Sequence, residues 1–82
     1  MLVREALTWG VLELEDFTSK QLESRILLAS ILNITQEGLL IRYNEHISQE
    51  EESAFYEYIK RRKALEPIAY IVGKKEFYGR DF

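Results

Sequence analysis

The sequence has 82 residues, 46% of them hydrophobic and 30% charged, with a formal net charge of −3. This length supports one small hydrophobic core, the composition excludes a disordered tail, and the lack of cysteine excludes disulfide bonds and thiolate metal sites. No apolar run approaches the roughly 20 residues needed to cross a bilayer, and no secretion signal opens the chain, so we expect a cytoplasmic protein.

The first predicted helix covers residues 2–14. Its apolar side chains recur at helical spacing. They are Val3, Leu7, Val11 and Leu14. Gly10 lies on the same stripe, where glycine costs a helix about 1 kcal/mol relative to alanine. We therefore expect Gly10 to allow another helix to approach closely.

A second helix is predicted over residues 19–32, and Thr18 and Gln21 have the spacing of a capping box at its start. Ser30 falls outside the apolar arc of this helix. The arc is formed by Leu22, Ile26, Ala29 and Leu32, and it is widened by Leu27, Leu28 and Ile31. So wide an apolar arc favours a central helix that packs on more than one side.

Two further helices have clear start signals. Thr35 is the predicted N-cap of a short helix over residues 36–42, and Ser48 with Glu51 forms the predicted capping box of a longer one. The longer helix carries a common face made of Phe55, Tyr58, Ile59 and Arg62. These signals predict a chain of helices joined by short loops.

Pro67 predicts where the fourth helix ends and a fifth begins. The residue before a proline is disfavoured in the helical region, so the fourth helix is expected to end near Ala64 or Leu65. Proline suits the first turn of a helix, which predicts a short helix over residues 67–72 with Gly73 as its left-handed cap.

The pattern changes after residue 73. Residues 74–82 are typical of an extended segment with a turn, and the aromatic residue at position 82 favours a chain that continues into a longer protein. The expected fold class is all-α, a small bundle of four to five helices. We expect the helical domain to cover residues 1–73 and the start of an interdomain linker or hairpin to cover residues 74–82.

Charge is distributed unevenly along the chain. Residues 1–59 carry 4 basic and 11 acidic side chains, whereas residues 60–82 carry 7 basic and 3 acidic ones. The basic run at residues 60–63 is expected to face the negative end of its helix dipole. A second interpretation, a nucleic-acid or ribosome contact through residues 60–75, stays open.

The residues offer little catalytic chemistry. His46 is the single histidine and is expected in a surface loop, and the three consecutive glutamates at 50–52 cannot converge on one ion from a helix. The four glycines are scattered, so no phosphate-binding loop is present in the sequence. We expect no catalytic, cofactor-binding or metal-binding residue in this chain and expect it to be inactive alone.

Residues 61–82 follow the pattern R-R-x3-E-P-x-A-Y-I-x-G-x2-E-F-Y-G-x2-F. This pattern resembles the segment that joins the two domains of the HemK/PrmC family, and helix order and length resemble that family upstream. The strong part of the resemblance covers about a quarter of the chain, the stretch at residues 61–82.

The resemblance implies a methyltransferase parent. The family transfers a methyl group from S-adenosylmethionine to the glutamine side-chain amide in the Gly-Gly-Gln loop of class I peptide-chain release factors. Its catalytic Asn-Pro-Pro-Tyr motif and cofactor loop belong to a second domain, and neither motif occurs in these 82 residues. The implied role of the helical domain is to bind and orient the release factor.

Three residues of the pattern are candidates for contacts with a partner or with the catalytic domain: Arg61, Arg62 and Tyr70. The other positions of the pattern are expected to be structural. We expect a release factor and the protein's own catalytic domain as partners, and neither a membrane nor direct nucleic-acid binding. The alternative is a free-standing helical protein-interaction module.

Overall fold

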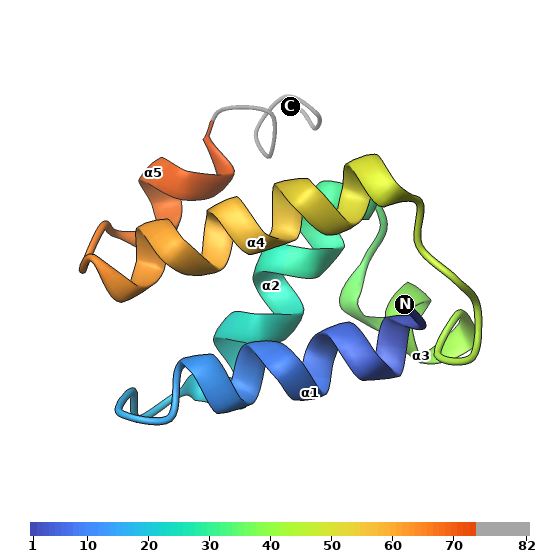
Figure 1. The fold of residues 1–82 in the computed structure, drawn as a ribbon, viewed down its shortest axis with the longest axis horizontal. Helices are drawn as coiled ribbons and strands as arrows, with labels where there is room; N and C mark the ends of the chain where they lie inside the picture. Colours follow the sequence, from blue (N-terminus) through green and yellow to red (C-terminus); the bar gives the residue numbers. More distant parts are fainter. Residues whose placement is uncertain (74–82) are drawn as a thin grey trace.

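The computed structural model describes residues 1–73, which form five helices and no named strand (Figure 1). The helices are α1 (Val3–Glu13), α2 (Lys20–Leu32), α3 (Gln36–Ile41), α4 (Gln49–Lys63) and α5 (Ile68–Val72). The predicted all-α bundle of four to five helices is therefore confirmed. The predicted extended segment at residues 74–82 lies outside the described residues. Among residues 1–73, no helix is both long enough and apolar enough to cross a membrane.

Helix α2 is the centre of the bundle. It packs against α1, α3, α4 and α5, and Figure 1 shows it running between α1 and α4, with α5 on the far side of α4 from α1. The expectation that this helix packs on more than one side is confirmed. The bundle is therefore organised around one central helix, α2, and not as two stacked layers.

The core draws side chains from all five helices. Phe55 on α4 is fully buried, and Ile59, one turn later, is 1% exposed. The remaining buried apolar residues are Val3, Ala6, Leu7, Leu14, Leu27, Leu28, Ala29, Leu39, Ile47, Ile71 and Val72. The predicted stripes of the first and fourth helices are therefore largely correct, although Val11 is only half-buried.

The buried face of α2 is not centred on the residues that the sequence predicted. Leu22 is 42% exposed, whereas Ser24 and Ser30 are buried. The apolar arc of this helix is too wide to define its centre. The face that turns inward carries Leu27 and Leu28 together with small side chains, and one of these, Ser24, lies close to Gly10 of α1. Ser30, which was expected outside the arc, is part of the packed surface.

Gly10 is the point of close approach between α1 and α2. A Cβ atom at Gly10 would clash with Ser24 Oγ and would lie 3.0 Å from Phe55 Cζ. Ser24 Oγ donates a hydrogen bond of 3.1 Å to the carbonyl of Leu7, one turn before Gly10. The expectation that this glycine admits another helix is confirmed.

Two of the predicted caps are present. Glu51 N donates to Ser48 Oγ at 3.0 Å and Ser48 N donates to Glu51 Oε1 at 2.8 Å, which is the reciprocal pattern of a capping box. Thr35 Oγ1 accepts a bond of 3.0 Å from Gly38 N. These caps define the starts of α4 and α3.

The capping box predicted at Thr18 and Gln21 is wrong. The N-cap of α2 is Ser19, and its side chain makes no capping hydrogen bond. The helix begins one residue later than the box requires, so its third position is occupied by Leu22, which has no acceptor to reach back to the backbone.

The N-terminus is attached to the loop between α3 and α4. Leu2 and His46 form an isolated antiparallel bridge. Val3 N donates to the carbonyl of Glu45 at 2.9 Å, and Ile47 N donates to the carbonyl of Met1 at 3.0 Å. These bonds hold the loop against the start of α1, and they place His46 in a structural position.

Candidate functional site

Helix α4 ends in a tight reversal that leads into α5. Leu65 has a φ of 73°, its N–H donates to the carbonyl of Arg62 at 2.8 Å, and Glu66 N donates to the carbonyl of Arg61 at 3.1 Å. These are the two hydrogen bonds of a Schellman motif, in which the left-handed position usually carries glycine. The predicted end of this helix near residues 64–65 is confirmed, and the motif sets the direction of α5.

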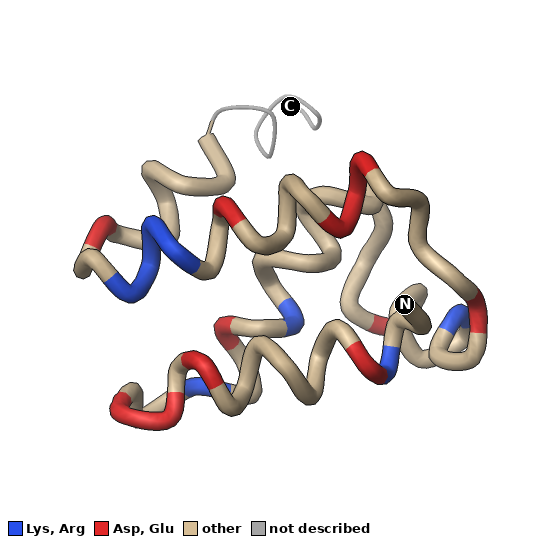
Figure 2. Tube along the Cα trace, viewed as in Figure 1, with Lys and Arg blue, Asp and Glu red and all other residues tan. Residues whose placement is uncertain are grey.

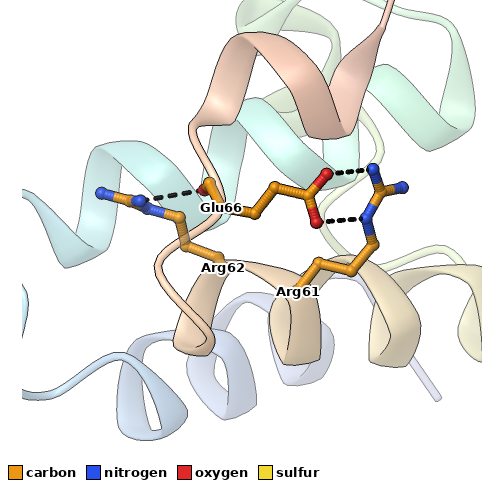
Figure 3. A network of polar contacts seen from close by, with 3 residues as sticks. All are labelled: Arg61, Arg62 and Glu66. Carbon is orange, nitrogen blue, oxygen red and sulfur yellow. Dashed lines mark hydrogen bonds and ion pairs between the residues drawn. The ribbon is translucent and has the colours of Figure 1, made fainter.

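Glu66 pairs with Arg61 across this reversal (Figure 3). Arg61 Nε donates to Glu66 Oε1 at 2.9 Å, and a second guanidinium nitrogen contacts Oε2. The hydrogen bond from Arg61, aided by its charge, lowers the pKa of the Glu66 carboxyl, and the same bond raises the pKa of Arg61. The pair therefore stays ionised and bidentate, an arrangement that fixes both side chains in one geometry.

Arg62 connects three parts of the bundle. Its Nε donates to Glu23 Oε1 of α2 at 2.9 Å, its Nη1 donates to the backbone carbonyl of Glu66 at 3.0 Å, and its guanidinium lies 4.7 Å from the ring centre of Phe17. The Arg62 side chain is 19% exposed and the Glu23 side chain 15%. The charge of Arg62 is therefore paired within the bundle, and this ion pair joins the end of α4 to α2.

A third basic residue of α4 also pairs with another helix. Lys63 Nζ lies 2.8 Å from Glu13 Oε1 at the end of α1. Figure 2 shows the acidic end of α1 and the basic end of α4 on the same side of the bundle. The sequence predicted a favourable interaction of these cations with the helix dipole. The structure adds ion pairs between helices, made by residues 39 and 50 positions apart.

Tyr70 lies apart from the two arginines in its surroundings. It is 73% exposed on α5, whereas its neighbours Ile71 and Val72 are buried. Of the three residues selected from the sequence, Arg61 and Arg62 meet around Glu66, and Tyr70 presents its ring to solvent. Gly73 follows α5 with φ 68° and ψ −163°, a region of the backbone that essentially only glycine occupies.

Two grooves on the surface were not predicted from the sequence. The first, here called the α1–α3 groove, has about 380 Å³ of free space and is lined by Leu7, Thr8, Val11, Leu12, Gln21, Arg25, Leu39, Leu40 and Tyr43. The second, the α1–α4 groove, has about 390 Å³ and includes Trp9 and Tyr56, whose rings lie 4.6 Å apart. The missed signal is the presence of large apolar residues outside the core stripes, such as Leu12 and Leu40.

Metal-ligating side chains and glycines do not cluster within residues 1–73. Within residues 1–73, no three His, Cys, Asp or Glu side chains are grouped closely enough to hold an ion. Gly10 and Gly38 lie inside helices, so neither belongs to a glycine-rich loop that opens a helix.

Comparisons with known proteins agree with this picture. Residues 5–73 match the family model described as the PrmC N-terminal domain. The chain is 35% identical over its full length to a release factor glutamine methyltransferase of Bacillus cereus, of which it spans 29%. It is 54% identical, over 74% of its length, to a bifunctional methyltransferase of Rickettsia prowazekii, of which it spans 12%. No solved structure matches the chain.

Proposed function

The chain belongs to the PrmC N-terminal domain family, and from this we propose that it is the substrate-recognition domain of a release factor glutamine methyltransferase. The observation that carries the proposal is the match over residues 5–73, together with relatives of that name that align over the whole chain. The chain spans less than a third of those relatives, so the activity belongs to a longer protein.

In this proposal the parent enzyme uses S-adenosylmethionine to methylate the glutamine of the Gly-Gly-Gln loop in class I peptide-chain release factors, in the cytoplasm during translation termination. The cofactor and the reacting atoms lie in the second domain. The mainly apolar grooves of the described residues support a role of this domain in binding a protein. The helical domain therefore contributes binding and orientation, and by itself it is inactive.

Residues 1–73 form the helical domain in this proposal, and residues 74–82 begin the linker to the catalytic domain. The family match ends at residue 73, which supports this boundary. Arg61 and Arg62 brace the reversal between α4 and α5, while Tyr70 on α5 is exposed. We assign Tyr70 a direct contact with the release factor or with the catalytic domain. The two arginines orient the helix that carries it.

The proposal is tested by comparing two substrates. Full-length enzyme and enzyme lacking residues 1–73 are assayed with intact release factor and with a short peptide containing the Gly-Gly-Gln loop. The truncated enzyme should methylate the peptide with unchanged kcat and should lose at least tenfold in kcat/KM on the intact release factor, because remote binding contacts are removed. Equal activity of both enzymes on the release factor would contradict the proposal.

If the truncated enzyme also loses activity on the peptide, its catalytic domain has not folded. A binding measurement then tests the proposed recognition role. The 82-residue chain is titrated into release factor by calorimetry and is added as a competitor to the full-length enzyme. Saturable binding and inhibition confined to the intact release factor support a recognition domain. No binding and no inhibition at concentrations a hundredfold above the KM for release factor would exclude it.

The Tyr70 assignment predicts a specific kinetic effect. In the full-length enzyme, Tyr70→Ala should raise the KM for release factor about tenfold, as loss of an aromatic anchor does. Tyr56→Ala is the matched control, since Tyr56 is also exposed but lies on α4. A fall in kcat on both substrates identifies a contact with the catalytic domain instead. Unchanged kinetics on both substrates would refute the assignment.

A further inference from the structure

Three large apolar side chains are exposed in one surface depression, the α1–α3 groove. Leu12 is 62% exposed, Leu40 66% and Tyr43 41%, and all three line the groove. Its floor includes Leu7 and Leu39, which belong to the core. The groove therefore has core residues of α1 and α3 at its floor, and α2 contributes the polar side chains of Gln21 and Arg25.

This clustering differs from the ordinary scatter of apolar residues on protein surfaces. Single exposed leucines are common, but apolar residues gathered in one concavity mark binding sites. A second depression lies alongside and shares Thr8, Leu12 and Tyr43 with the groove. The second depression adds Trp9 together with the charged side chains of Arg4 and Glu5, so the concave surface continues along α1 with a mixed lining.

The charge at the groove indicates the chemistry of the partner. Arg25 is the only charged residue among the described residues that line it. The ion pairs of the described chain occupy Arg61, Arg62 and Lys63, and none of them involves Arg25. A guanidinium that has no ion-pair partner among residues 1–73 and lies at a mainly apolar groove matches a segment that combines apolar side chains with a carboxylate. This cation lies within residues 1–59, which are otherwise predominantly acidic.

The position of the groove favours a separate protein over the protein's own catalytic domain. The groove is formed by α1, α2 and α3, whereas the chain leaves the bundle after α5, which packs on α2 and α4. Figure 1 shows α5 and α1 on opposite sides of the bundle. The described part of the chain therefore ends after a helix that does not line the groove, which favours a separate molecule as the occupant.

We propose that the α1–α3 groove docks an apolar segment of the release factor, and that a carboxylate of this segment pairs with Arg25. The inference rests on the proposed function and identifies the surface through which it is performed. Leu40 and Leu12 are the apolar anchors.

The experiment uses full-length enzyme carrying Leu40→Glu, with Ile41→Glu as the matched control. Both residues lie on α3 and are exposed, Ile41 at 83%, but only Leu40 lines the groove. Leu40→Glu should raise the KM for intact release factor at least tenfold without changing kcat, because it removes binding made equally in the ground and transition states. Ile41→Glu should leave both constants within twofold of the wild type. Activity on the Gly-Gly-Gln peptide should be unchanged in both variants.

A second variant tests the charge. Arg25→Glu should raise the KM for release factor by a similar factor, and the loss should shrink as salt is added, since an exposed ion pair is screened. Equal KM values for wild type, Leu40→Glu and Arg25→Glu would overturn the groove assignment. The proposed function would still hold in that case if the enzyme lacking residues 1–73 loses activity on intact release factor. Only the groove assignment would then be wrong.

Other occupants give different results. If a second copy of the chain fills the groove, wild-type enzyme sediments as a dimer and Leu40→Glu as a monomer, with an unchanged KM. If the catalytic domain fills it, Leu40→Glu lowers kcat on the peptide as well as on the release factor. Either outcome would overturn docking of the release factor at this surface.

Discussion

Leu65 occupies a backbone conformation that leucine rarely adopts. Its φ is 73° and its side chain is 73% exposed, so the strain of the left-handed conformation is not offset by burial of the side chain. A left-handed residue with a Cβ costs roughly 1–2 kcal/mol relative to glycine. The two Schellman hydrogen bonds and the following Pro67 hold it in place.

Leu65→Gly should therefore stabilise the folded chain by about 1 kcal/mol, offset in part by the greater freedom of glycine when unfolded. For a domain of this size that corresponds to a rise in Tm of about 4–8 °C. Thermal and urea unfolding of the 82-residue chain measure the change. Ala64→Gly is the control, because Ala64 has an ordinary negative φ of −81°, and it should not stabilise. A loss of stability in Leu65→Gly would show that the leucine side chain packs against the bundle.

At the scale of the elements, the contact between α1 and α2 depends on two small residues. Gly10 on one helix and Ser24 on the other leave no space for a methyl group. The serine hydroxyl is buried and bonded to the carbonyl of Leu7, so it cannot turn away without losing its partner. The glycine therefore costs helix propensity but permits the close approach of α1 and α2.

Gly10→Ala should destabilise the chain by about 1–3 kcal/mol, because overpacking outweighs the gain in helix propensity. Urea unfolding measures the loss. Gly38→Ala is the matched control: its nearest contact would be the Ile34 side chain at 3.2 Å, and it should cost less than Gly10→Ala. Combining Gly10→Ala with Ser24→Ala should recover part of the loss, and strict additivity of the two changes would contradict the proposed clash.

The elements also show which features are predictable from sequence. The capping box at Ser48 and Glu51 depends on residues three positions apart, and it was predicted correctly. The pair of Arg62 with Glu23 joins residues 39 positions apart, and no local pattern specifies it. The burial of Ser30 likewise depends on which side of α2 receives its neighbours.

The same distinction applies to the candidate site. Arg61, Arg62 and Tyr70 were selected because they lie in one continuous pattern, and their contact role stays a prediction. The α1–α3 groove could not be selected, because Leu12, Arg25 and Leu40 belong to three helices. Their proximity is a product of the fold, and it becomes visible only once α2 is placed between its neighbours.

At the scale of the molecule, the distribution of charge over residues 1–73 leads us to expect no recognition of nucleic acid by this part of the chain. The formal net charge is −3, and Arg61, Arg62 and Lys63 are each paired with a glutamate within the bundle. A protein that binds phosphates needs several unpaired cations on one face, because each phosphate contact releases counterions and supplies part of the affinity. Lys60 is the remaining cation of the run at residues 60–63.

Titration of the 82-residue chain with structured or single-stranded RNA should therefore show no binding, even at low salt, where phosphate contacts are strongest. Fluorescence anisotropy at about 20 and 200 mM salt measures this, since a contact made through several phosphates weakens steeply over that range. The triple variant Glu13→Gln, Glu23→Gln and Glu66→Gln is an informative control. It removes the carboxylates that pair with the α4 cations and raises the net charge by three, so if its fold is retained it should bind RNA more tightly than the wild type. Salt-sensitive binding by the wild-type chain would instead show that cations outside these pairs are sufficient, and would revive a ribosome or RNA contact through residues 60–75.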